Sequence, residues 1–116
     1  MVQMLDLSGH GVLEFSVEPS DTVVEAGQSA VLDCVVRASH HQQSVLITWL
    51  DEDGSKLTFL SDAYRSQLTN GSLYINSVVE GQRLTGIYQC MATLPNVGSI
   101  VSRTAKLDIA SKSAVS

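Results

Sequence analysis

Two cysteines, Cys34 and Cys90, each lie in a run of residues that alternates between two faces with a period of two. One face of the first run carries Ala30, Leu32, Cys34 and Val36, and one face of the second carries Gly86, Tyr88, Cys90 and Ala92. Such alternation predicts β-strands, whereas no long stretch shows helical periodicity. Turn-forming residues separate the runs, including Asp53-Gly54 and Asn70-Gly71. Short strands with frequent turns indicate an all-β sandwich or barrel.

The chain has 116 residues, which is enough for one domain with its own core. We expect a flexible N-terminal tail over 1–12, a domain over 13–110 and a C-terminal tail or linker over 111–116. The strands are expected near 13–17, 22–25, 29–37, 45–51, 56–60, 64–68, 72–77, 86–93 and 100–109.

Trp49 and Tyr88 have characteristic positions relative to the two cysteines. Trp49 follows Cys34 by 15 positions, and Tyr88 precedes Cys90 by two. This is the immunoglobulin pattern of an inter-sheet disulfide, a tryptophan packed on it and a tyrosine corner. It predicts an all-β, immunoglobulin-like Greek-key β-sandwich of the I-set type. A Cys34–Cys90 disulfide is expected if the compartment is oxidising.

Three longer strings are more specific. They are Phe15–Thr22, Leu68–Ile75 and Ser99–Leu107, and they resemble the first immunoglobulin domain of the DCC/neogenin/protogenin receptor family. The resemblance covers about 13–110. It implies that the parent is a single-pass plasma-membrane receptor with tandem immunoglobulin and fibronectin type III domains, and that this domain is extracellular. It also implies that a sibling domain packs on this one in a horseshoe, and that netrin contacts in netrin-binding members lie mostly elsewhere.

Leu84 departs from the family pattern. The family usually has Asp-x-Gly-x-Tyr-x-Cys here, and Gly86, Tyr88 and Cys90 match, but Leu84 stands at the position of the aspartate. That aspartate commonly pairs with a basic residue at the base of the strand near 64–68. We therefore expect this corner to be held in another way, with Leu84 buried.

Composition and motifs exclude several functions. A formal net charge of −5 makes nucleic acid or an anionic membrane surface a poor partner. His40 and His41 are expected to be solvated loop residues, and the acidic stretch 51–54 is expected to be a hairpin turn; neither predicts a metal site. Without a Gly-x-Ser-x-Gly motif or a deep pocket, we expect no enzyme activity, no catalytic residue and no cofactor.

Apolar residues occupy the positions expected to face outward on one sheet. If Trp49 and Cys90 point inward, the residues that face outward are Leu46, Leu50, Ile87 and Met91, with Ile100 beside them. An apolar patch of this kind predicts a protein-binding face. Its candidate partners are a sibling immunoglobulin domain, a homophilic copy or a separate ligand. The alternative is a set of scattered exposed residues without a binding role.

Asn70-Gly71-Ser72 is an N-glycosylation sequon that is equally explained as a plain turn. Taken together, these features predict a non-enzymatic extracellular immunoglobulin module of an adhesion or guidance receptor that acts by protein–protein recognition. The alternative is a structural I-set module of a multidomain scaffold, intracellular or in the matrix, with no ligand of its own.

Overall fold

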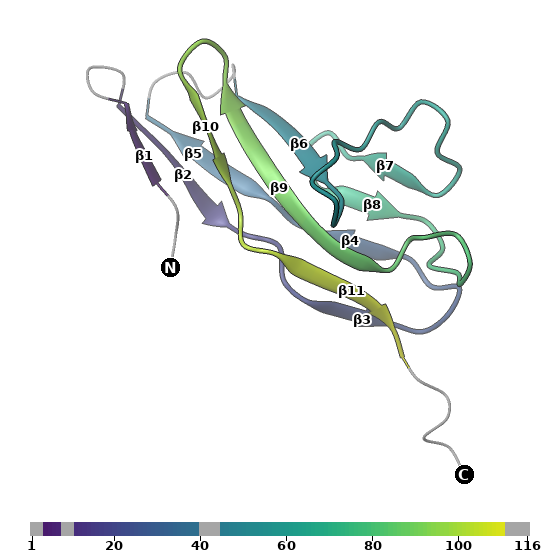
Figure 1. Cartoon of the computed structure of the whole chain (residues 1–116). Helices are drawn as coiled ribbons and strands as arrows, with labels where there is room; N and C mark the ends of the chain where they lie inside the picture. Colours follow the sequence, from purple (N-terminus) through teal and green to yellow (C-terminus); the bar gives the residue numbers. More distant parts are fainter. Residues whose placement is uncertain (1–3, 8–10, 40–44, 111–116) are drawn as a thin grey trace.

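A computed structural model describes residues 4–7, 11–39 and 45–110, and these residues form an all-β fold (Figure 1). Its strands are β1 (Met4–Leu7), β2 (Gly11–Val17), β3 (Thr22–Val24), β4 (Ala30–Leu32), β5 (Val35–Ala38), β6 (Leu46–Leu50), β7 (Arg65–Gln67), β8 (Leu73–Ile75), β9 (Gly86–Leu94), β10 (Gly98–Val101) and β11 (Ala105–Ile109). No helix in this part of the chain could span a membrane.

The strands form two layers (Figure 1). In one layer the order is β10-β9-β11-β3, with β6 on the other side of β9. The opposite layer consists of β1-β2-β5 and β4-β8-β7. The pairing of β3 with β11 is parallel, so the first long strand is split between the two layers. The predicted I-set immunoglobulin-like sandwich is confirmed.

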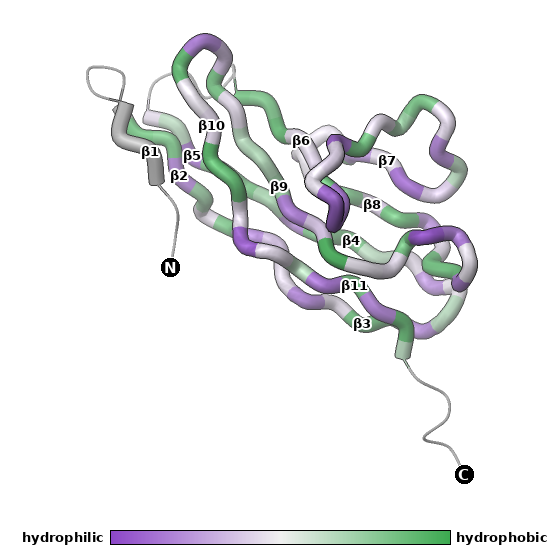
Figure 2. Tube along the Cα trace, viewed as in Figure 1, coloured by the Kyte–Doolittle hydropathy of each residue, from purple (hydrophilic) through white to green (hydrophobic). Residues whose placement is uncertain are grey.

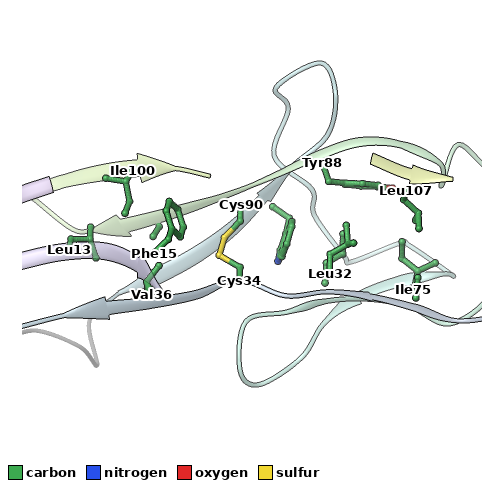
Figure 3. Close-up of a cluster of buried hydrophobic side chains, with 14 of the residues drawn as sticks. Leu13, Phe15, Leu32, Cys34, Val36, Ile75, Tyr88, Cys90, Ile100 and Leu107 are labelled. Carbon is green, nitrogen blue, oxygen red and sulfur yellow. A yellow bond between two sulfur atoms is a disulfide. The ribbon is translucent and has the colours of Figure 1, made fainter. Parts of the chain in front are cut away.

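A disulfide between Cys34 and Cys90 joins the two layers through the centre of the core, with a Cα–Cα distance of 6.4 Å (Figure 3). The side chains of Leu32 and Phe15 lie on either side of it, and both are buried. Trp49 is the register partner of Cys90 and is 0% exposed. The loop closed by this bridge spans 56 positions, which in the loop-entropy description stabilises the fold by about 4 kcal/mol.

The N-terminal segment contains a strand that the sequence did not predict. β1 pairs with β2 in antiparallel register, with Leu5 opposite Leu13 and Leu7 opposite Gly11. The expectation of a flexible tail over 1–12 is therefore wrong for residues 4–7, 11 and 12. Pairing supplies hydrogen-bond partners along the outer edge of β2, which would otherwise be an open sheet edge.

The strand predicted at 100–109 is divided into β10 and β11 at Ser102–Thr104. Ser102 is buried, its amide donates to the Cys90 carbonyl, and its hydroxyl accepts from the Cys90 amide. Next to it, the Arg103 amide donates to Glu18 and its guanidinium to the Pro19 carbonyl. These bonds replace regular ladder pairing, so the strand is interrupted there.

The short strand predicted near 56–60 is also absent. Only an isolated bridge between Leu50 and Lys56 occupies this region, together with a hydrogen bond from the Leu57 amide to the Trp49 carbonyl. Further along this edge of β6, the side-chain amide of Gln67 donates to the Ile47 carbonyl at 2.9 Å. A side chain thus satisfies a backbone group that a neighbouring strand would otherwise pair.

Candidate protein-interaction face

The outer face of β6, β9 and β10 is built from three strands in antiparallel register. Met91 in β9 lies at its centre, because its register partners are Thr48 in β6 and Val101 in β10. Toward one end, Leu50 lies opposite Gln89; toward the other, Leu46 lies opposite Thr93. We call the outward residues of these strands the β6–β9–β10 face: Leu46, Thr48, Leu50, Ile87, Gln89, Met91, Thr93, Ser99 and Val101.

The predicted outward direction is correct for four of the five candidate binding residues. Leu46 is 57% exposed, whereas Leu50, Ile87 and Met91 are partly buried at the surface. Figure 2 shows the hydrophobic stretches that run along β6, β9 and β10. Ile100 is a correction: it is only 4% exposed and belongs to the core.

The interruption at Ser102 explains the error at Ile100. In β11, Ala105 and Leu107 point inward, and an unbroken strand would carry this alternation back to place Ile100 outside. In β10 the phase is reversed, and Ile100 is opposite the buried Ala92. Val101 therefore occupies the outward position in place of Ile100. The irregular segment at Ser102–Thr104 shifts the phase of alternation between β10 and β11, and the sequence pattern did not reveal it.

In the part of the chain that the structure describes, charged residues border one end of the face. Lys106, opposite Ile87 in register, forms a 3.7 Å ion pair with Asp108. A carboxylate oxygen of Glu52, in the turn after β6, accepts a hydrogen bond from the Ile87 amide at 3.3 Å. The turn itself is the predicted hairpin, because the Asp51 carboxylate accepts from the amides of Asp53 and Ser55.

The predicted tyrosine corner lies beneath this face. The Tyr88 hydroxyl donates to the Leu84 carbonyl at 2.5 Å and accepts from the Arg65 guanidinium at 3.2 Å. Burial raises the pKa of Tyr88 above its ordinary value, although Arg65 acts in the opposite direction. The tyrosine therefore stays a neutral donor.

Arg65 has a different partner from the one the family pattern provides. Its guanidinium forms a 2.7 Å ion pair with Asp62, three residues earlier in the chain. Burial alone would raise the pKa of Asp62, but hydrogen bonds from the Arg65 and Tyr64 amides and from the Arg65 side chain hold it below its ordinary value. Leu84 is buried in the core, as expected. Sequence analysis missed Asp62, which no motif marked.

The Asn70-Gly71-Ser72 turn also supports the core. The Asn70 side-chain oxygen accepts from the Ser72 amide, while the buried Ser72 hydroxyl donates to Asp33. The Trp49 indole N–H donates to the Gly71 carbonyl at 2.8 Å. Asn70 itself is exposed. The turn thus has a structural role whether or not it carries a glycan.

No cluster of potential metal ligands is found among residues 12–39 and 45–110. Within these ranges, no three His, Cys, Asp or Glu side chains converge on a common point. His40 and His41 lie outside the described residues. Within the described part, every buried side-chain nitrogen and oxygen has a hydrogen-bond partner.

The fold and its core signature define an immunoglobulin-like module. The sequence profile of the family described as "Immunoglobulin domain" matches residues 14–93. The chain belongs to this family.

Its similarity extends to particular receptors. It is 44% identical to neogenin of Rattus norvegicus over 101 residues and 40% identical to netrin receptor DCC of Homo sapiens over 101 residues. Each match covers 84% of this chain and 7% of the relative, so the chain spans a small part of their length. The resemblance to the DCC/neogenin family is thereby confirmed, and with it the prediction that the chain is not an enzyme.

Solved structures support the fold. The N-terminal Ig1-2 module of the Drosophila receptor protein tyrosine phosphatase DLAR is 22% identical, with a TM-score of 0.71 over 85% of this chain and 46% of that one. At this identity, the likeness concerns the fold alone.

Proposed function

We propose that this chain is an extracellular immunoglobulin module of a cell-surface adhesion or guidance receptor and that it acts by protein–protein recognition through the β6–β9–β10 face. The observation that carries the proposal is the position of Met91. It lies opposite Val101 in β10 and opposite Thr48 in β6, with Leu46 and Leu50 diagonally across from it on β6. Apolar side chains that gather on the outer face of a small domain are typical of an interface.

The extracellular location is supported by the disulfide and by the relatives. A buried Cys34–Cys90 bridge is typical of an oxidising compartment. One of the relatives is named a netrin receptor, and the present chain matches a small part of it. The proposed recognition role of the β6–β9–β10 face does not depend on netrin binding by this domain.

We further propose that Asn70 carries an N-linked glycan in the secreted protein. Its side chain is exposed on the turn between β7 and β8. Mass spectrometry of secreted chain before and after enzymatic deglycosylation should show a loss of mass in the parent sequence and no loss in Asn70→Gln. A single unshifted mass in the parent sequence would contradict this modification.

The recognition role can be tested with charged substitutions on opposite faces. Leu50→Glu and Met91→Glu place a carboxylate on the β6–β9–β10 face, while Val31→Glu places one on the other sheet, where Val31 is 43% exposed. Receptor ectodomains with these substitutions, and one lacking the domain, would be screened against purified cell-surface and secreted proteins.

We expect at least one partner to bind the parent ectodomain and Val31→Glu but neither face variant, with thermal unfolding showing that all variants fold. Equal binding by Leu50→Glu and Met91→Glu would remove this face as the recognition site. Equal binding by the ectodomain lacking the domain would remove the recognition role of the domain altogether.

A further inference from the structure

A hollow opens at the side of the sandwich where the turn between β7 and β8 lies beside the first residues of β5 and β6. It has a volume of about 480 Å³, and Val35, Leu46 and Leu68 are among the residues that line it. These three side chains are 42%, 57% and 39% exposed, respectively. Exposed apolar side chains that gather around one hollow typically mark a surface that another group covers.

The two strands at this hollow are edge strands in the part of the chain that the structure describes. β5 is the last strand of the order β1-β2-β5, and β9 is the one strand that pairs with β6. Further along β6, the bridge between Leu50 and Lys56 and the bond from Gln67 to the Ile47 carbonyl cover its edge. None of the described segments pairs with this edge at Leu46. Open edges can pair with other chains, and proteins usually cover them.

Asn70, the first residue of the Asn70-Gly71-Ser72 sequon, also lines the hollow. Its side-chain Oδ1 accepts a hydrogen bond from the Ser72 amide at 2.9 Å, which fixes the plane of the side-chain amide. Within the described residues, its Nδ2 donates no hydrogen bond. An N-linked sugar is attached to Nδ2, so its attachment leaves the bond to Ser72 intact and places the sugar beside the hollow.

From these observations we infer that the first N-acetylglucosamine on Asn70 lies in the hollow, against Leu46 and Leu68, and covers the edges of β5 and β6. This inference rests on the proposed N-linked glycan at Asn70. The sugar has the required chemistry, because its C–H groups and its acetyl methyl can contact apolar side chains while its hydroxyls stay in water. Removing apolar surface from water stabilises the folded state. A bulky, hydrated group at this place also hinders the pairing of other chains with the two edges.

The test compares two forms of the chain that have the same sequence. Secretion from cells restricted to high-mannose glycans, followed by endoglycosidase H, leaves one N-acetylglucosamine on Asn70. Production in the bacterial periplasm leaves no sugar and still allows the disulfide to form. The two forms therefore differ by a single sugar ring.

Nuclear Overhauser effects measure the position of the sugar directly. In the single-sugar form, the acetyl methyl and ring protons should show Overhauser effects to the methyl groups of Leu46 and Leu68. The methyl groups of Val31, on the outer face of β4, should show none. A sugar without an Overhauser effect to either leucine would overturn the inference.

Thermal unfolding measures the stabilisation. The single-sugar form should unfold at a temperature about 4–8 °C higher than the sugar-free form. Leu46→Ser removes an apolar contact and should reduce this difference to less than half, whereas Val31→Ser is the matched control and should leave it unchanged. Both side chains are exposed, so we expect both variants to fold. Equal unfolding temperatures of the two parent forms, or the same difference in all three chains, would contradict packing in the hollow.

Failure of this inference is distinguishable from failure of the proposed modification. If the secreted chain loses no mass on deglycosylation, Asn70 carries no glycan and both are wrong. If the chain is glycosylated but its first sugar contacts neither Leu46 nor Leu68, the glycan stands in solvent and only the position in the hollow is wrong. The recognition role is tested separately, with Leu50→Glu and Met91→Glu.

Discussion

The Arg65 guanidinium lies 3.2 Å from the Tyr88 hydroxyl and 2.7 Å from the Asp62 carboxylate, so one cation connects the tyrosine corner to the loop before β7. Tyr88 in turn donates to the Leu84 carbonyl. These residues form a continuous chain of polar contacts at the end of the sandwich where β9 begins.

Removing the Tyr88 hydroxyl should destabilise this corner. In Tyr88→Phe the Leu84 carbonyl loses its donor in a buried setting, which should lower the free energy of unfolding by about 1–3 kcal/mol. Urea unfolding measures the change. Tyr74→Phe, on the outer face of the other sheet, is the matched control and should change stability by less than about 0.5 kcal/mol. Equal effects of the two substitutions would contradict the role of the corner.

Asp62 should make stability depend on acidic pH. Its pKa is lowered in the folded state, so the ionised form is favoured by folding. This contribution is complete above the unfolded-state pKa of about 4 and is lost as the pH falls through the lower folded-state value. Urea midpoints between pH 2 and 7 should fall more steeply in the parent chain than in Asp62→Asn. Parallel profiles would show that this carboxylate makes no differential contribution.

Because Leu84 stands where the family usually has an aspartate, we expect an energetic coupling between positions 84 and 62, which are far apart in the sequence. Leu84→Asp removes a buried side chain and introduces a carboxylate that competes with Asp62 for Arg65, so we expect a loss of roughly 3–5 kcal/mol. Adding Asp62→Ala leaves Arg65 available to the new carboxylate. The double variant should therefore lose less free energy of unfolding than the sum of the two single losses, by at least about 1 kcal/mol. Urea unfolding of all four chains, compared in a double-mutant cycle, measures this difference. Strict additivity would argue that Arg65 does not change partner.

Gly71 should tolerate substitution less well than another glycine with positive φ. Gly71 has φ +97°, and an added Cβ would lie 3.2 Å from Ile47 Cγ1. Gly27 has φ +87° but open space around the added atom. Gly27→Ala should cost about 1–2 kcal/mol from backbone strain alone, and Gly71→Ala should cost more. Thermal unfolding compares them, and a larger loss at Gly27 would contradict the packing of Ile47 on this turn.

The sequence predicted those parts of the fold that depend on regular patterns. Alternation around Cys34 and Cys90 defined the inward face of both central strands, and the turns at Asp51–Gly54 and Asn70–Gly71 form as expected. The prediction of one continuous strand over 100–109 failed where one residue interrupts the pattern. Ser102 replaces ladder bonds with its own hydroxyl, and this reverses the phase that placed Ile100 outside.

Part of the candidate face could be predicted from the regular alternation of inward and outward residues. Leu46, Leu50, Ile87 and Met91 follow from the inward direction of Trp49 and Cys90 on paired strands. Val101 was missed because its direction depends on the interruption. The hydrogen bond between the Thr93 and Ser99 hydroxyls could be found only from the register, since these residues become neighbours only when β10 pairs with β9.

The ion pair that holds Arg65 comes from the same short segment as Arg65 itself, with Asp62 only three residues away. A corner built in this way does not need an acidic residue in the loop between β8 and β9. The exposed positions of that loop are then free to diverge in sequence during evolution, as long as positions 78 and 84 keep apolar side chains for the core. Drift in this loop among close homologues, together with retention of acid and base at 62 and 65, would be the signature of that freedom.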